Sequence, residues 1–194
     1  MIDFDHMLKD RYFSAMAYQE GSKDNPIVLV FERPGRVEVE FQSPVSGSTG
    51  VNLRRLLKII HDDYVSSDEL NVFAIEDLMI VNSSPRPKYE GYEKDKIPSF
   101  RRSEDDARKL IEKIGCKKIV VCFGKNAEAF YSDFLKQCSG DAIVCCHLSR
   151  KGLNSARIDK NITYDSNNSD YRKLKCMATK IYRSVMERMK SKRG

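Results

Sequence analysis

The fold of this chain is decided by the stretch P-I-V-L-V-F, residues 26–31. Its five residues after the proline are apolar without alternation, which is typical of a parallel strand that is buried on both faces. The predicted strands are residues 27–31, a part of 73–81, 118–123 and 142–146. The predicted helices are residues 4–20, 51–64, 103–114, 126–137 and 170–190. The long predicted loops are residues 32–50, 82–100 and 147–168. Strands that alternate with helices predict an α/β fold, a three-layer α/β/α sandwich around a central four-stranded parallel sheet.

Polar residues follow three of these apolar runs directly. Glu32 follows the first strand, Asn82 follows the run 78–81, and His147 follows the run 142–146. The carboxyl ends of parallel strands share one edge of a sheet, where open α/β sheets bind ligands. An acid, an amide and an imidazole at one edge suit the recognition of a polar ring. The sequence therefore predicts an enzyme that acts on a nucleobase.

The composition places the chain among globular proteins of a reducing compartment. With 194 residues, we expect one domain over residues 1–194 that needs no disulfide or metal to fold. None of the six cysteines forms a C-x-x-C pair, so we expect structural thiols, a cytoplasmic location, no metal and no cofactor. No apolar run reaches membrane-spanning length, and Asp3 and Asp5 stand where a secretory leader would be basic or apolar. The net charge of +6 permits nucleic acid as a partner, and we expect a monomer.

Five short segments carry a resemblance to a known family. They are V-L-V-F-E-R-P-G (28–35), S-P-V-S-G-S-T-G-V-N-L (43–53), M-I-V-N-S-S-P (79–85), I-V-V-C-F-G-K-N-A (119–127) and H-L-S-R-K-G-L-N (147–154). In this order they resemble the uracil-DNA glycosylase superfamily, and most of all its G-E-x-P-G type. The resemblance covers about residues 27 to 154. It implies removal of uracil or another deaminated or damaged base from DNA, by cleavage of the N-glycosidic bond after base flipping.

The chain also departs from the pattern of that superfamily. Phe31 and Arg33 stand where its first motif has a glycine and a small residue, and Leu148 replaces the middle proline of its H-P-S motif. Val45 stands where a phenylalanine usually stacks on uracil, and the cysteine ligands of an iron-sulfur cluster are absent as a pattern. The chain therefore resembles a divergent, cluster-free member, and the preferred base stays open.

The resemblance and the chemistry of base release together imply roles for three residues. Cleavage builds positive charge on the sugar and negative charge on the base. Glu32 is expected to position water or to stabilise the sugar cation, and a neutral His147 to donate a hydrogen bond to the base oxygen. Asn82 offers a donor and an acceptor to the edge of the base. The structural alternatives are a solvated acid or an ion pair with Arg33, a histidine that caps the sheet, and a turn-forming asparagine.

The loops supply candidates for stacking and for contacts with DNA. A flipped base needs a flat partner, and Phe41 is the candidate, with Phe100 as its rival. Leu153 is predicted to be an apolar wedge that fills the space left by the flipped base. The residues predicted to contact DNA are Ser84, Ser149, Arg150, Lys151 and Leu153. The alternatives are a loop anchor for the aromatic ring and an ordinary basic loop at 150–154.

The leading hypothesis is therefore a metal-free DNA N-glycosylase that acts on single- or double-stranded DNA. One alternative is an enzyme that holds a free nucleoside or nucleotide in the same crevice, with the long loops as a lid. Another is a nucleic-acid-binding module that kept the fold and lost the reaction, for which Arg33 and Val45 are the best support.

Overall fold

The computed structural model of this chain describes residues 18–65, 72–84, 111–112, 114, 119–136 and 142–191. Within them, five strands form one sheet in the order β1-β3-β2-β4-β5. The strands are β1 Tyr18–Gln19, β2 Ile27–Phe31, β3 Met79–Asn82, β4 Ile119–Phe123 and β5 Ile143–Cys145. The last four are parallel, as predicted, and their registers align Phe31 with Asn82 and Phe123 with Cys145. The carboxyl ends of these four strands therefore lie at one edge of the sheet.

Strand β1 corrects the predicted helix at 4–20 and adds a fifth strand to the predicted four. Tyr18 and Gln19 pair antiparallel with β3. The side chain of Gln19 donates hydrogen bonds to the carbonyl oxygens of Ile75 at 2.7 Å and Leu78 at 3.1 Å. Pairing with the open edge of β3 thus outweighs helical periodicity at these residues. The predicted helix up to residue 17 lies outside the described residues.

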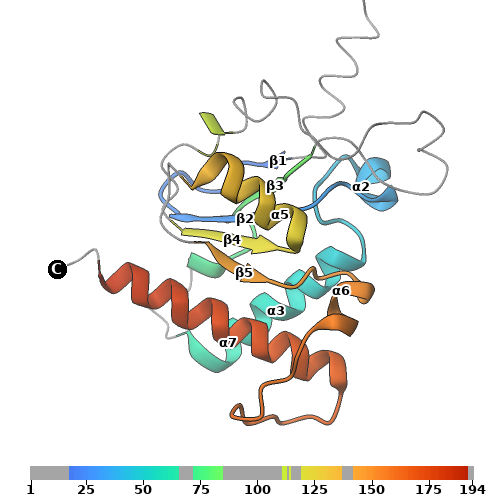
Figure 1. Cartoon of the computed structure of the whole chain (residues 1–194), viewed down its shortest axis with the longest axis vertical. Helices are drawn as coiled ribbons and strands as arrows, with labels where there is room; N and C mark the ends of the chain where they lie inside the picture. Colours follow the sequence, from blue (N-terminus) through green and yellow to red (C-terminus); the bar gives the residue numbers. More distant parts are fainter. Residues whose placement is uncertain are drawn as a thin grey trace, which may run out of the picture.

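Helices cover both faces of the sheet, which confirms the three-layer architecture (Figure 1). On one face lie α3 Ser48–Tyr64 and α7 Ser169–Lys190, whose apolar stripes pack against alternate strand residues such as Leu29. On the other face lies α5 Lys125–Phe130, which continues as a π-helical turn over Tyr131–Leu135. Successive residues of a strand point into opposite layers, and both layers are buried. The sequences of the strands are therefore unbroken apolar runs.

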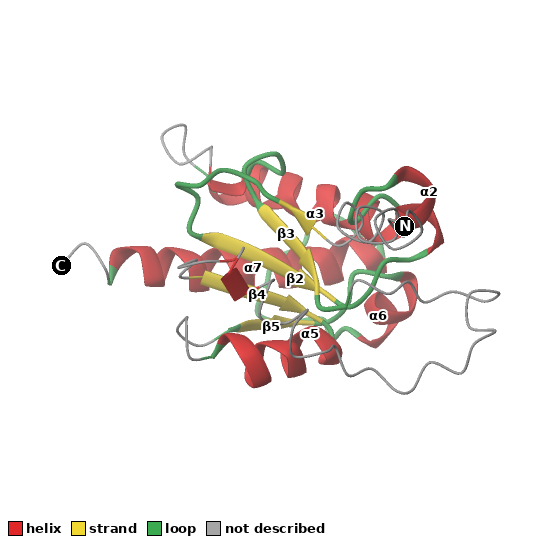
Figure 2. Ribbon diagram, turned by 90° about the horizontal axis from the view of Figure 1, so that it is seen from above, coloured by secondary structure: helices red, strands yellow, loops and turns green. Residues whose placement is uncertain are grey.

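Two short helices correct the predicted loops. The first, α2 Arg36–Phe41, lies within the loop predicted at 32–50, and α3 begins at Ser48 rather than at residue 51. The second, α6 Arg150–Ser155, lies within the loop predicted at 147–168. Figure 2 shows both short helices at the end of the molecule where the parallel strands terminate. Both helices therefore border the edge at which the sequence places the site.

The other predicted segments are described only in part. The loop predicted at 82–100 is described as far as Ser84, and the helix predicted at 103–114 only at residues 111, 112 and 114, which are helical. The four cysteines within the described residues are free thiols. No helix in the described part of the chain is both long and apolar enough to cross a membrane.

Candidate functional site

A cavity of about 300 Å³ lies at the carboxyl edge of the sheet. Glu32 after β2, Asn82 at the end of β3 and His147 after β5 all line it. The structure therefore brings together the three residues that the sequence placed at this edge. The first residues of α2 and the N-terminal turn of α3 complete the wall. Asn82 is 2% exposed, so its amide is held within the protein rather than in a solvated turn.

Hydrogen bonds from the end of β3 fix the backbone at Glu32. The amide of Ser83 donates to the carbonyl oxygen of Phe31 at 2.7 Å, and its hydroxyl donates to the carbonyl oxygen of Glu32 at 2.7 Å. The amide of Ser84 donates to that same Glu32 oxygen at 3.1 Å. These bonds extend the pairing of β2 with β3 and set the direction of the acid. Ser84 is buried, so the structure does not place its hydroxyl where a DNA phosphate would approach.

Gly124, directly after β4, lets Glu32 and His147 approach each other. A Cβ atom built at Gly124 would lie 3.3 Å from Glu32 Oε1, 3.3 Å from His147 Cβ and 3.5 Å from His147 Cδ2. The residue has φ +98°, a conformation that favours glycine. The carboxylate of Glu32 and the imidazole of His147 thus both lie close to a residue that has no side chain. Groups from the ends of β2 and β5 therefore come near each other beside the end of β4.

Burial favours the neutral form of His147, and a backbone hydrogen bond defines the tautomer of that form. The backbone amide of Ser149 donates to His147 Nδ1 at 3.0 Å, so the proton of the neutral ring is carried by Nε2. Burial lowers the pKa of His147 below its ordinary value of 6.5, and the charges of Glu32 and Glu38 oppose that shift. The ring also lies edge-on to Phe31 at 6.3 Å. The site therefore offers a neutral N–H donor rather than an imidazolium.

The backbone around His147 is fixed from three directions. The side chain of Asn52 in α3 donates to the carbonyl oxygen of Leu148 at 2.8 Å. Ser149 caps α6 by accepting from the amide of Gly152 at 3.2 Å. A Cβ atom at Gly152 would lie 2.0 Å from the carbonyl oxygen of His147, so a glycine is required there. Leu148, which replaces the proline of the resembled motif, is fully buried in the core.

Glu38 is a cavity residue that the sequence did not predict. It is 8% exposed, and its Oε2 accepts the backbone amide of Gly35 at 3.0 Å at the start of α2. Its spacing of three residues from Gly35 is the signal that could have revealed both the short helix and the inward acid. Arg33 and Arg36 also line the cavity. The lining of the cavity therefore includes two acids and two arginines besides the histidine, and the guanidinium group of Arg36 pairs with Glu40 at 3.0 Å.

Val45 lines the cavity in a strained backbone conformation. Its φ is +50°, which is rare for a β-branched residue. Its carbonyl oxygen would lie 1.4 Å from a Cβ atom built at Gly50, so α3 begins directly against this turn. Outliers of this kind concentrate at functional sites. The position at which the resembled family has an aromatic ring is thus part of the wall, but with an aliphatic side chain.

Two predicted roles are corrected by burial. Phe41 is 71% exposed and does not line the cavity, so it is not placed to stack on a base held there. Its rival Phe100 lies outside the described residues. Leu153 is 2% exposed and belongs to the core beneath α6, so it is not a surface wedge. The exposed residues of that helix next to Ser149 are Arg150 and Lys151, which keep the predicted positive charge near the cavity.

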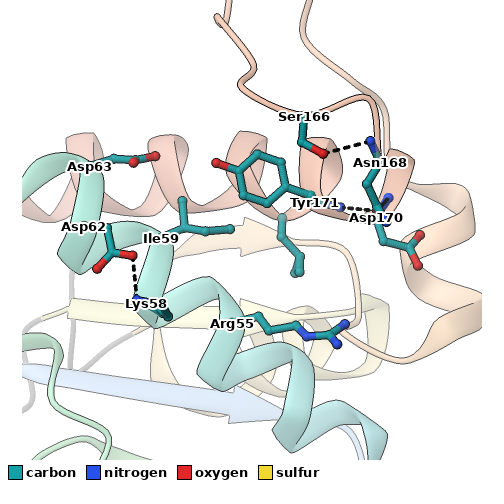
Figure 3. Close-up of a pocket in the computed structure, with 10 residues that line it drawn as sticks. Arg55, Lys58, Ile59, Asp62, Asp63, Ser166, Asn168, Asp170 and Tyr171 are labelled. Carbon is teal, nitrogen blue, oxygen red and sulfur yellow. Dashed lines mark hydrogen bonds and ion pairs between the residues drawn. The ribbon is translucent and has the colours of Figure 1, made fainter.

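A second cavity, of about 430 Å³, lies between α3 and α7 (Figure 3). Its wall includes Arg55, Lys58, Asp62 and Tyr171. Lys58 and Asp62 form an ion pair at 2.8 Å on the exposed side of α3. Among the described residues, no group of three or more His, Cys, Asp or Glu side chains could hold a metal ion.

Comparison of the chain with models of known protein families finds no match, and comparison with curated proteins finds none either.

Proposed function

We propose that this protein is a DNA N-glycosylase that hydrolyses the bond between deoxyribose and uracil or another deaminated or damaged base. The observation that carries the proposal is that the Glu32 carboxylate and His147, whose pKa is lowered by burial, both lie beside Gly124 in one cavity. A negative group and a neutral donor at one site match the two charges that develop when the glycosidic bond breaks. The likeness of the flanking motifs to the uracil-DNA glycosylase superfamily supports the same assignment.

The proposed reaction divides the work between the two sides of the cavity. As the C1′–N bond breaks, its electron pair stays with the base, and the Nε2–H of His147 donates a hydrogen bond to the base oxygen that gains charge. Glu32 stabilises the positive sugar and orients the water that adds to C1′. The products are an abasic sugar and the free base, which takes the proton that the water releases. Asn82 holds the edge of the base with its amide.

The dimensions and surroundings of the cavity agree with one flipped base as the ligand. A volume of about 300 Å³ is at the small end of sites for small molecules. The exposed cations Arg150 and Lys151 directly follow Ser149 of the cavity wall and suit the phosphates of a nucleic acid. We further propose that the protein acts as a monomer in the cytoplasm, where free thiols such as Cys176 persist.

A second candidate function is the binding of nucleic acid without chemistry. Arg33 and Arg36 line the cavity next to Glu32 and Glu38. A guanidinium group close to Glu32 would hold the carboxylate in an ion pair and away from the sugar. Under this alternative, DNA binds and no base is released.

Abasic-site formation on labelled oligonucleotides tests the proposal. Single- and double-stranded substrates carry one uracil, hypoxanthine, xanthine or thymine opposite guanine. We expect release of at least one base, and a loss of about 10² or more in rate for Glu32→Gln. The matched control is Glu76→Gln, which changes an exposed acid that precedes β3 in the chain. This variant is expected to keep the wild-type rate. Binding of DNA without any release would favour the second candidate.

A further inference from the structure

The cavity between α3 and α7, the α3–α7 cavity, is separate from the cavity at the sheet edge. No described residue lines both. One wall is a face of α3, and the other is the start of α7 with the residues that lead into it (Figure 3). The volume of about 430 Å³ falls within the range of sites that hold small molecules. What this cavity can hold is therefore decided by its own lining.

The base of the α3–α7 cavity is apolar. Ile59 of α3 is 7% exposed and Leu174 of α7 is 2% exposed, and both belong to the hydrophobic core beneath the cavity. The half-buried ring of Tyr171 lines the cavity and packs against the same core. A recessed apolar surface of this kind suits an aliphatic or aromatic group of a ligand.

Most of the charged groups around this apolar base already have partners. Lys58 and Asp62 form an ion pair at 2.8 Å along α3. Asp63 pairs with the Nζ atom of Lys175 on α7 at 3.2 Å, and that same atom pairs with Asp165 at 2.8 Å. These groups hold the two helices and the preceding loop together, so they are not available to a ligand.

Two charged side chains of the lining differ from these pairs. Arg55 and Asp170 make no ion pair or side-chain hydrogen bond within the described part of the chain. Figure 3 shows them at one end of the cavity, whereas Asp62 and Asp63 lie at the other. Asn168 lies at the same end as Arg55, and its Oδ1 atom accepts two backbone amides of α7 at 2.9 Å and 3.0 Å, which leaves its Nδ2 group as a donor. One end of the cavity thus offers a cation, an amide donor and a carboxylate.

We propose that the α3–α7 cavity binds a free α-amino acid with an apolar or aromatic side chain. The guanidinium group of Arg55 and the Nδ2 group of Asn168 donate to its carboxylate, because a guanidinium group and a carboxylate form paired hydrogen bonds. The carboxylate of Asp170 accepts from its ammonium group. The side chain of the ligand lies on the apolar base. A purely anionic or purely cationic ligand would leave either Asp170 or Arg55 without an opposite charge.

Fluorescence of L-tryptophan tests this site without any nucleic acid, so the result does not depend on the proposed base release. The chain contains no tryptophan, so the ligand is the only indole in the sample. We expect its fluorescence anisotropy to rise on titration with the full chain. Tryptamine lacks the carboxylate and indole-3-propionate lacks the ammonium group, and each is expected to bind about tenfold more weakly. Equal binding of the three compounds would overturn the proposal.

Two variants connect each charge of the ligand to one residue. Arg55→Gln is expected to weaken L-tryptophan about tenfold and to leave tryptamine unchanged, since tryptamine has no carboxylate to lose. Asp170→Asn is expected to weaken L-tryptophan by a similar factor and to leave indole-3-propionate unchanged. Arg54→Gln and Glu187→Gln change exposed charges on the same two helices outside the cavity, and both should keep the affinity of the wild type.

Thermal unfolding with L-leucine gives a second readout for a smaller side chain. A ligand that binds only the folded state raises the unfolding temperature, and we expect this rise in the wild type and its loss in Arg55→Gln. The absence of a response to both L-tryptophan and L-leucine at millimolar concentrations would overturn the proposal. So would an Arg55→Gln variant that binds L-tryptophan as tightly as the wild type.

Discussion

The cavity at the sheet edge and the cavity between α3 and α7 differ in what their charged groups do. The cavity between α3 and α7 is the larger, at about 430 Å³ against about 300 Å³, but its Lys58 and Asp62 are exposed and satisfy each other. The cavity at the sheet edge holds polar groups from three strand ends, of which Asn82 is buried and Glu32 and His147 are half-buried, and burial lowers the pKa of His147. Desolvated polar groups that face a cavity can act on a ligand, whereas paired surface charges are already satisfied. The volume of a cavity therefore says less about function than the environment of its lining.

Removal of one side chain from each cavity is expected to have very different effects. His147→Ala is expected to slow base release by about 10² or more, because it removes the donor to the developing base oxyanion. Tyr171→Phe, in the wall of the α3–α7 cavity, should leave release unchanged. Single-turnover base release measures both, with circular dichroism as the check on folding. Equal rates for a folded His147→Ala variant and the wild type would refute the assignment.

Next in size is the effect of adding one methyl group behind the histidine. Gly152→Ala would place a Cβ atom 2.0 Å from the carbonyl oxygen of His147, so the backbone must shift. We expect the free energy of unfolding to fall by about 1–3 kcal/mol and base release to fall with it. Asn154→Ala, exposed on the same helix, is the control and should change neither quantity. Urea unfolding and base release under matched conditions test the pair.

The half-buried histidine of the sheet-edge cavity makes the stability of the protein depend on pH. Burial lowers the pKa of His147 in the folded protein below 6.5, the ordinary value in the unfolded chain. Above pH 6.5 the ring is neutral in both states, so its full contribution to the stability of the fold is present. As the pH falls from 6.5 through the folded-state pKa, the unfolded chain takes up a proton that the folded protein does not, and that contribution is lost. The free energy of unfolding should therefore decrease by at most about 1.4 kcal/mol per pH unit in that window. Denaturant unfolding between pH 5 and 7 should show this slope in the wild type and a weaker one in His147→Gln.

The α3–α7 region is expected to respond at the opposite end of the pH scale. Hydrogen bonding and ion pairing with Asp165 at 2.8 Å, together with Asp63, raise the pKa of Lys175 above its ordinary value of 10.5. Its contribution to stability is present below pH 10.5 and is lost as the pH rises through the raised pKa.

A fall in stability between pH 5 and 7 that persists in His147→Gln would show that a group other than His147 governs the acid range.

The smallest expected effect comes from the exposed ion pair of the α3–α7 cavity. Lys58→Ala removes the partner of Asp62, but both side chains are largely in water. Thermal unfolding and base release should both stay within error of the wild type. A clear loss of base release in Lys58→Ala would show that this cavity takes part in the function.

The central strands could be predicted from the sequence, and the short elements could not. Unbroken apolar runs such as residues 27–31 signal a buried parallel strand through local composition alone, and the meeting of Glu32, Asn82 and His147 follows from topology. The six-residue helices α2 and α6 depend on single capping contacts, namely Gly35 to Glu38 and Ser149 to Gly152, which are weak signals in a sequence.

Burial of individual loop residues was the harder part of the site. Leu153 and Phe41 are both apolar residues in segments that the sequence predicts to be loops, yet one lies in the core and the other is exposed. Which of them packs inward depends on the helices α6 and α2 that carry them. Glu38 was missed for the same reason, because an acid is expected at the surface unless its backbone partner is known.

The position of β2 at the centre of the sheet has a consequence for folding kinetics. Val28 pairs with Met79 on one side and with Val120 on the other, so its neighbours come from distant parts of the chain. Contacts of high sequence separation slow folding, because each requires the closure of a long loop. Glu32, Asn82 and His147 lie at the ends of strands that make such contacts of high sequence separation. During synthesis, the site is complete only after residue 147 has emerged and β5 has joined β4, so a chain truncated before that point carries the acid without its partner.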